Sequence, residues 1–224
     1  MEEVVNPEEL SLEEGTFLVR LARDAVSSYL KSWKVPSRPP ETPETLLRRG
    51  AAFVTLLRIT PTGERELRGC IGYVKATEPL VDSVIHAAIA AATEDPRFPP
   101  LRSYELQHIV FEVSILSNPE IVVLQGKDRV KGFVIGRDGL IIRKGFYSGL
   151  LLPEVPVEYC WDEETFLSET CIKAGLPPDC WLDRESELLR FSAVTFREEQ
   201  PGGAVVRRDL RKEYKTTCTH LFRT

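Results

Sequence analysis

The amino-acid sequence predicts an α+β protein with mixed or antiparallel sheets and packed helices. Three observations lead to this class. Apolar segments with turn-forming residues between or within them predict two β-hairpins, further strands stand apart, and three predicted helices do not alternate strictly with strands. The chain has 224 residues, of which 42% are hydrophobic and 28% charged, values typical of a folded globular protein.

The N-terminal part of the chain predicts a helix followed by a hairpin. Residues 11–33 begin with Ser11 and Glu14 at capping-box spacing, and their apolar residues then fall on one helical face. The proline-rich segment 35–44 cannot continue this helix and predicts a surface connector. Residues 51–74 read as two strands around the turn-forming TPTGER, which predicts a β-hairpin.

The next elements are an alanine-rich helix over residues 78–95 and an alternating strand over 108–116. The sequence DPRFPPL, residues 95–101, ends the helix because three prolines leave no helical continuation. Beyond them the sequence predicts a hairpin over residues 132–145, with its turn at Asp138-Gly139, and an extended segment over 149–159. A helix over 162–175 and a last strand over 188–196 follow.

Charge is distributed unevenly along the chain. Residues 201–224 carry six Lys and Arg against two Asp and Glu, whereas the first 200 residues carry 23 against 32. We expect residues 201–224 to be a flexible, solvated basic tail, with nucleic acid an unlikely partner. No apolar run reaches the roughly 20 residues that a membrane helix needs. The acidic N-terminus does not resemble a signal peptide, so we expect a cytoplasmic protein with no membrane association.

The five cysteines are odd in number and form no C-x-x-C pair, which argues against a secreted disulfide framework and a zinc knuckle. A bridge between Cys171 and Cys180 remains an alternative if the source is a hyperthermophile. One Met, many Arg and Glu, and 16 Pro favour a thermophilic source. The three histidines lack the spacing of a helical zinc motif, and no nucleotide-binding loop is present, so we expect neither a metal nor a cofactor.

The motif LRGCIG places two glycines, Gly69 and Gly72, in an otherwise apolar strand. Glycine in a strand marks a bulge or a close approach of another backbone. We expect either the alanine-rich helix or the DPRFPPL loop to approach the hairpin on the side of Cys70. Cys70 is then either a ligand-facing thiol on the same face as Arg68 or a small buried residue, and it is the one candidate for a catalytic nucleophile.

The DPRFPPL loop and the strand after it supply the remaining candidates. Arg97 could clamp a carboxylate or phosphate with Phe98 as an apolar wall, or both could be structural anchors. Glu112 lies between core residues, so we expect it to pair with Arg68 or Arg97, as part of a polar pocket or as a brace. The predicted binding residues are Arg68, Gly69, Cys70, Gly72, Asp95, Arg97, Phe98 and Glu112.

Five motifs, LRGCIG, DPRFPPL, EVSIL, GLLLPEVPVE and CIKAGLPPDCW, occur in this order. Together they resemble the AMMECR domain family, named after a human X-linked deletion syndrome with midface hypoplasia and elliptocytosis, and this chain resembles an archaeal or bacterial member. The resemblance implies an AMMECR-like fold over residues 1–200, in two subdomains, the larger formed by both ends. Cys160 and Cys180 stand where the family commonly has glycine and alanine, so we interpret them as local variation, and Glu154 replaces a common glutamine.

The resemblance implies no particular reaction. Family members are fused to, or encoded beside, Memo-like proteins and radical S-adenosylmethionine proteins. The resemblance therefore favours a binding or adaptor module that acts with a Memo-like partner, through a pocket around LRGCIG that could hold a small-molecule ligand. The alternative is an enzyme of a modification or transfer pathway that uses Cys70.

Overall fold

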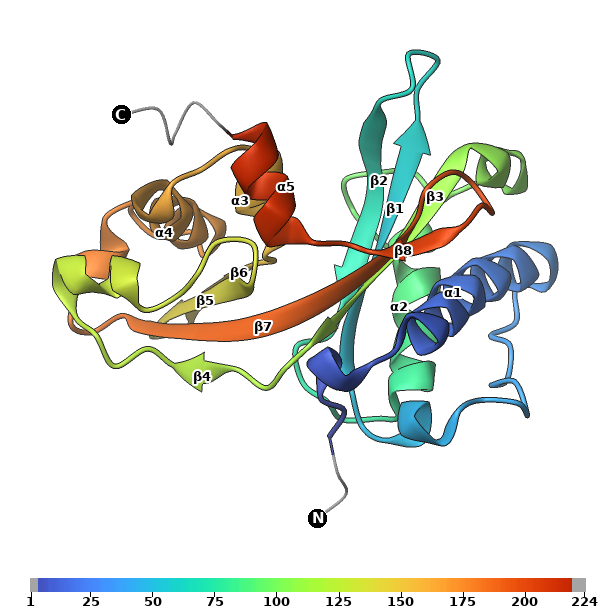
Figure 1. Cartoon of the computed structure of the whole chain (residues 1–224), viewed down its shortest axis with the longest axis horizontal. Coiled ribbons are helices and arrows are strands. Elements are labelled where there is room, and N and C mark those ends of the chain that lie inside the picture. Colours follow the sequence, from blue (N-terminus) through green and yellow to red (C-terminus); the bar gives the residue numbers. More distant parts are fainter. Residues whose placement is uncertain (1–3, 219–224) are drawn as a thin grey trace. The chain divides into compact units, whose positions relative to one another are not determined.

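The computed structural model describes residues 4–218, which divide into two compact units. Unit 1 contains residues 4–118 and 194–208, and unit 2 contains residues 119–193 and 209–218. Each unit has its own hydrophobic core, built mainly from residues of that unit. Helices and strands are mixed in both, which confirms the predicted α+β class (Figure 1).

Within the described residues the strands are β1 (Ala51–Ile59), β2 (Arg65–Gly72), β3 (Ile109–Leu116), β4 (Glu120–Ile121), β5 (Asp138–Lys144), β6 (Tyr147–Leu151), β7 (Glu187–Glu198) and β8 (Val205–Arg207). The α-helices are α1 (Leu12–Ser32), α2 (Leu80–Thr93), α3 (Glu154–Glu158), α4 (Glu163–Lys173) and α5 (Leu210–Thr217). Short 3-10 helices connect them, among them η3 (Ser103–His108).

The sheet of unit 1 is antiparallel around β1, which pairs with β2 on one side and β3 on the other. Strands β1 and β2 form the predicted hairpin, and β2 is the edge strand. Helix α1 begins at the predicted capping box, since the Ser11 hydroxyl accepts the Glu14 N–H and the Glu14 carboxylate accepts the Ser11 N–H. Helices α1 and α2 pack together and against this sheet, because each presents an apolar surface to it (Figure 1).

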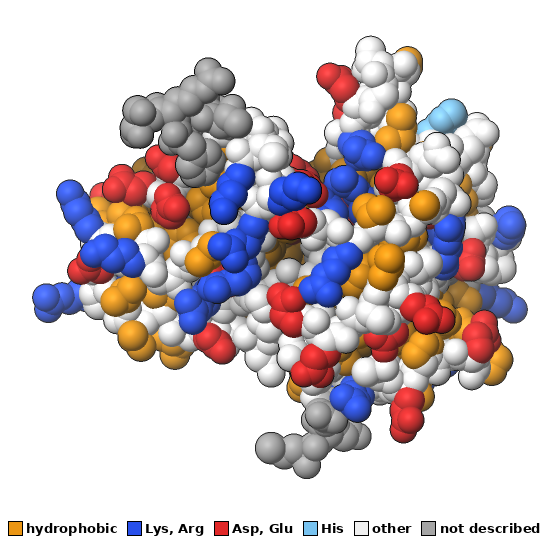
Figure 2. Space-filling model, viewed as in Figure 1, with side chains coloured by type: hydrophobic (Ala, Val, Ile, Leu, Met, Phe, Trp, Pro, Cys, Tyr) orange, Lys and Arg blue, Asp and Glu red, His pale blue; other side chains and the backbone are white. Residues whose placement is uncertain are grey.

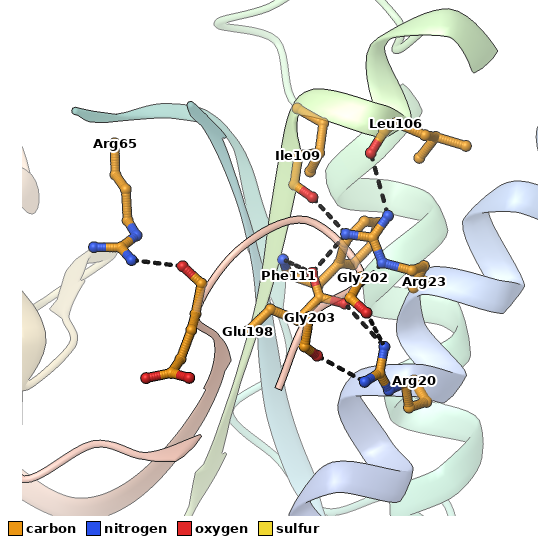
Figure 3. Close-up of polar contacts among 10 residues, drawn as sticks. Arg20, Arg23, Arg65, Leu106, Ile109, Phe111, Glu198, Gly202 and Gly203 are labelled. Atoms are coloured by element: carbon orange, nitrogen blue, oxygen red, sulfur yellow. Dashed lines mark hydrogen bonds and ion pairs between the residues drawn. The ribbon is translucent and has the colours of Figure 1, made fainter. Parts of the chain in front are cut away.

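A buried ion pair ties α1 to the C-terminal part of β7. Arg23 donates two hydrogen bonds to the carboxylate of Glu198, which has no exposed surface, at 2.7 and 2.5 Å (Figure 3). The same carboxylate accepts the backbone N–H of Phe111 at 3.0 Å, and Arg23 also donates to the backbone oxygens of Leu106 and Ile109. Because the buried carboxylate and the partly buried guanidinium are paired and hydrogen-bonded, this cluster fixes α1, β3 and β7 relative to each other.

Unit 2 is built on β5, which pairs with β6 and with the N-terminal part of β7. Helix α4 covers this small sheet through Phe166 and Leu167, which belong to a buried cluster with Phe133 and Trp181. Residues 154–158, which the sequence predicted to be extended, form the short helix α3.

The predicted hairpin turn at Asp138-Gly139 is wrong, because these residues begin β5. The actual turn joins β5 to β6 at Gly145 and Phe146, where Gly145 has the positive φ of 57° that such two-residue turns require. Asp138 is buried instead, and its carboxylate accepts the Val134 N–H and pairs with Arg137. An Asp that accepts a nearby backbone N–H inside the fold cannot be distinguished, in the sequence, from an Asp in a hairpin turn.

The C-terminal residues differ from the expected flexible tail. Residues 205–207 form β8, and residues 210–217 form α5. The prediction rested on the charged composition and overlooked an apolar stripe at four-residue spacing. This stripe consists of Leu210, Tyr214 and Cys218, all of which are buried. Residues 219–224 of the expected tail lie outside the described part of the chain.

Four of the five cysteines form two disulfides in unit 2. Cys160 is bonded to Cys218 and Cys171 to Cys180. The interpretation of Cys160 and Cys180 as local variation is therefore wrong, because each has a bonding partner that the family comparison did not reveal. Cys70 is outside both disulfides.

The surface carries charges of both signs. In Figure 2, basic and acidic side chains both occur across the face in view, as the 29 Lys and Arg and 34 Asp and Glu of the chain predict. Between residues 4 and 218, no helix is long and apolar enough to cross a membrane.

Candidate functional site

The LRGCIG motif contains a β-bulge. The register of the hairpin pairs Leu56 with Gly69 but Leu57 with Leu67, so Arg68 is an extra residue with no partner in β1. A bulge interrupts the two-residue alternation of a strand and redirects a side chain. Arg68 and Cys70 therefore contact different groups, although their spacing predicted a shared face.

Gly69 lies where α2 crosses the hairpin. A Cβ atom at this position would lie 2.1 Å from the backbone oxygen of Ala91, which only glycine avoids. Of the two expected candidates, the helix is thus the element that approaches Gly69. It does so on the face opposite Cys70, because successive strand residues point to opposite faces. Gly72 is instead crowded by Phe53 of the neighbouring strand.

The DPRFPPL loop follows α2 and lies along the free edge of β2. The Asp95 carboxylate accepts the backbone N–H of Cys70 at 2.9 Å. Arg97 donates to both oxygens of that carboxylate at 2.9 and 2.7 Å, and its Nη2 lies 3.5 Å from the Cys70 carbonyl oxygen. The hydrogen bonds from Arg97 lower the pKa of Asp95 to about 2, against the raising effect of burial. Arg97 and Asp95 are thus brought to the motif as expected.

Cys70 is half-buried and contacts the strand beside it. The Thr55 hydroxyl donates to the Cys70 sulfur at 3.3 Å. Thr55 also lies opposite Glu112 of β3, so Cys70, Thr55 and Glu112 form one row across three strands. Cross-strand neighbours share a face, which places Glu112 on the side of the sheet that carries the thiol.

The prediction that Glu112 pairs with Arg68 or Arg97 is wrong. Glu112 is 1% exposed, and its carboxylate lies 2.9 Å from Arg208 and 3.6 Å from Arg197. Both arginines come from the segment of the chain that closes unit 1, on the far side of β3 from the hairpin. Burial does require a cationic partner, as expected, but this partner is supplied by the C-terminal part of the chain.

Arg68 pairs with Glu105 of η3. Its Nε and Nη2 donate to the two carboxylate oxygens at 3.0 and 3.2 Å, and the backbone N–H of Arg102 donates to the same carboxylate at 2.8 Å. Burial alone would raise the pKa of Glu105, but these hydrogen bonds outweigh it and the pKa is lowered. The Arg68 guanidinium carbon lies 5.9 Å from the centre of the Phe98 ring.

Two adjoining hollows open beside this ion pair. The smaller, of about 360 Å³, is lined by Arg58, Leu67, Arg68, Phe98, Pro99, Pro100, Arg102, Tyr104 and Glu105. The larger, of about 740 Å³, is lined by Arg58, Ile59, Thr60, Pro61, Glu66, Tyr104, Glu105 and His108. Of the predicted residues, Arg68 and Phe98 line the smaller hollow, and Cys70 lines neither hollow.

Sequence reasoning missed Arg102, Tyr104 and Glu105. The only signal was the spacing of Arg102 and Glu105, three residues apart just after the DPRFPPL loop, which fits a capped turn. In the described part of the chain, no group of three His, Cys, Asp or Glu side chains could hold a metal ion.

The contact between Gly69 and α2 predicts unequal effects of two substitutions in the motif. Gly69→Val should lower the free energy of unfolding by roughly 2–4 kcal/mol, because the added side chain displaces the helix backbone. Cys70→Ala should cost roughly 1 kcal/mol or less, because the thiol is half-buried. Urea unfolding of both variants measures the difference, and equal stabilities would contradict the packing constraint.

Asp95 predicts a pH dependence of stability. Its pKa is below the ordinary value of 3.8, so the ionised form stabilises the folded state above pH 4, and this contribution is lost as the pH falls toward 2. Asp95→Asn should cost up to about 2 kcal/mol at pH 7, discounted because Arg97 is half-exposed to solvent. The difference between the two proteins should shrink between about pH 4 and pH 2 in urea titrations. A constant difference would contradict the assignment.

Comparisons with known proteins identify the family. The AMMECR1 family model matches residues 19–196. The chain is 52% identical to a protein of Thermococcus gammatolerans, over 88% of this chain and 96% of that protein. It is 50% identical to the protein MK0488 of Methanopyrus kandleri, over 92% and 99% of the two chains. The crystal structure of the uncharacterized protein PH0010 from Pyrococcus horikoshii is similar with a TM-score of 0.85, at 50% identity, over 88% of this chain and 97% of that one. These archaeal relatives fit the thermophilic composition, and the chain belongs to the AMMECR1 family.

Proposed function

We propose that this protein is a binding module whose ligand-facing site is the smaller hollow beside the LRGCIG motif. The observation that carries the proposal is the bulge that turns Arg68 out of the strand alternation and into the lining of this hollow. Bulges commonly redirect a side chain next to a functional site. A strand that needed Arg68 only as a surface charge would not require one.

The lining of the hollow suits recognition. Phe98, Pro99 and Pro100 form a rigid apolar wall, because the prolines fix the backbone of the loop. Tyr104 lines the hollow with 73% of its surface exposed, so its ring is accessible to a partner. Apolar walls with a few placed polar groups are the usual composition of binding pockets.

The partner that we propose is a Memo-like protein, as the family resemblance implies. A surface aromatic beside a guanidinium is the type of residue pair that dominates binding energy in protein interfaces. Tyr104 and Arg102 lie next to each other at the rim of the hollow and provide such a pair. The partner would contact this rim, so that the hollow is covered in the complex.

A titration tests this proposal with one variant and one matched control. A Memo-like protein encoded in the same genome should bind with a dissociation constant of about tens of micromolar or tighter in calorimetry. Tyr104→Ala should weaken binding about tenfold, the effect expected of an interface aromatic, and Tyr159→Ala, an equally exposed tyrosine of unit 2, should change it less than about twofold. The absence of a complex, or equal effects of the two variants, would contradict the proposal.

A second candidate is an enzyme that uses the Cys70 thiol. Arg97 favours it, because its Nη2 lies 3.5 Å from the Cys70 carbonyl oxygen and places a cation beside this residue. A nearby cation favours the reactive thiolate form. The Asp95 carboxylate offsets this cation, which is why binding remains the first candidate.

Alkylation distinguishes the two candidates. Without reductant, iodoacetamide should label Cys70 alone, because the other four cysteines are in disulfides. If the thiol is activated, Arg97→Gln should slow labelling at pH 7 by about threefold or more, since the cation that favours the thiolate is removed. The rate follows from mass spectrometry, with Cys70→Ala as the unlabelled control. If iodoacetamide labels Cys70 no faster in the native protein than in the unfolded protein, a nucleophilic role is excluded.

A further inference from the structure

We infer that the smaller hollow binds a carboxylate or phosphate carried on an apolar or aromatic group. The inference rests on the proposed function for the location of the ligand and adds the chemistry of that ligand. Three kinds of observation support it: the charges that line the hollow, the orientation of Arg68, and the apolar wall.

The lining has an excess of positive charge. Three arginines, Arg58, Arg68 and Arg102, line it with one carboxylate, that of Glu105. Arg58 is paired with Glu66 at 2.7 Å and Arg68 with Glu105, so the charge of Arg102 is the one in excess. This carboxylate already accepts three hydrogen bonds, from Arg68 and from the Arg102 backbone, and so has little capacity to attract a cationic ligand. An anion is therefore the charged group that the hollow is best suited to bind.

Arg68 is held in one orientation before any ligand arrives. Its side chain is buried, with 7% of the residue exposed, and the two-point pair with Glu105 uses Nε and Nη2. Nη1 takes no part in that pair. A guanidinium fixed in this way can donate to a carboxylate or phosphate oxygen without losing further side-chain freedom, which is the basis of affinity through preorganisation.

The remaining lining selects what carries the anion. The ring of Phe98 lies near both arginine side chains that flank it, 5.9 Å from the guanidinium carbon of Arg68 and 5.6 Å from that of Arg97. Pro99 and Pro100 extend the same wall. A planar or apolar group placed here gains contact area while its anion reaches Arg68 and Arg102.

The larger hollow provides a contrast. It shares Arg58, Tyr104 and Glu105 with the smaller one, but adds Glu66 and no further arginine. Its lining therefore has two carboxylates against one guanidinium. An anion is accordingly directed to the smaller hollow, and the larger one leaves room for an uncharged or cationic extension of the same ligand.

A panel of small probes tests this chemistry by calorimetry with the full chain. Phenyl phosphate and benzoate should bind at least about fivefold more tightly than inorganic phosphate or benzyl alcohol, because each of the latter offers only half of the recognised group. Benzylamine, with the opposite charge, should bind at least about fivefold more weakly than benzoate. Binding of benzylamine as tight as that of benzoate, or no binding of any anionic probe at about 10 mM, would overturn the inference.

Arg102→Gln is the main variant, because its side chain is exposed and its loss should leave the fold intact. This substitution should weaken the binding of phenyl phosphate about tenfold, as expected for the loss of a charge-assisted hydrogen bond. Arg184→Gln, an exposed arginine of unit 2, is the matched control and should have no effect. Equal affinities for the two variants would overturn the inference.

The anion could be a free molecule or a side chain of the protein partner. If phenyl phosphate displaces a bound Memo-like protein, the partner supplies the anion, and if it binds without displacement, a free ligand does. Both results support the recognised chemistry. A complex that forms while no probe binds refutes this inference alone, whereas probes that bind without any complex refute the proposed partner alone.

Discussion

The close approach of α2 to β2 at Gly69 determines where every part of the candidate site lies. The helix can cross the strand at this distance only because position 69 has no side chain. With the helix fixed there, its C-terminal end releases the DPRFPPL loop along the edge of β2. Asp95, Arg97 and Phe98 then reach the motif from only a few residues of loop.

The local features of this fold follow from the sequence more reliably than the pairing of its charges. The capping box of α1 and the hairpin of residues 51–74 depend on neighbouring residues, so pattern and turn chemistry predict both. The importance of Gly69 also follows from its presence in a strand. The partners of Glu112 do not, because Arg197 and Arg208 come from the C-terminal part of the chain, far from Glu112 in sequence. The glycines indicated a bulge or a close approach without deciding between them, and the bulge at Arg68 changes the direction of that side chain.

The motif combines two roles that its spacing suggested were one. Arg68 belongs to a polar group with Glu105 and the rim of a hollow, while Cys70 belongs to a row with Thr55 and Glu112. Gly69 separates them and holds the helix. A single short segment thus supplies a guanidinium to one environment and a thiol to another, which accounts for the density of glycine in a strand that is otherwise apolar.

The hydrogen bond from the Cys70 N–H to Asp95 has a further consequence for association between molecules. An edge strand presents unpaired N–H and C=O groups, and a second strand can add to them. Here a carboxylate of the same chain already occupies the Cys70 donor on the exposed edge, and Arg97 lies beside the Cys70 acceptor. Strand addition at this edge would have to displace an ionised, guanidinium-bound carboxylate. The loop that builds the site therefore also discourages this protein from polymerising through β2.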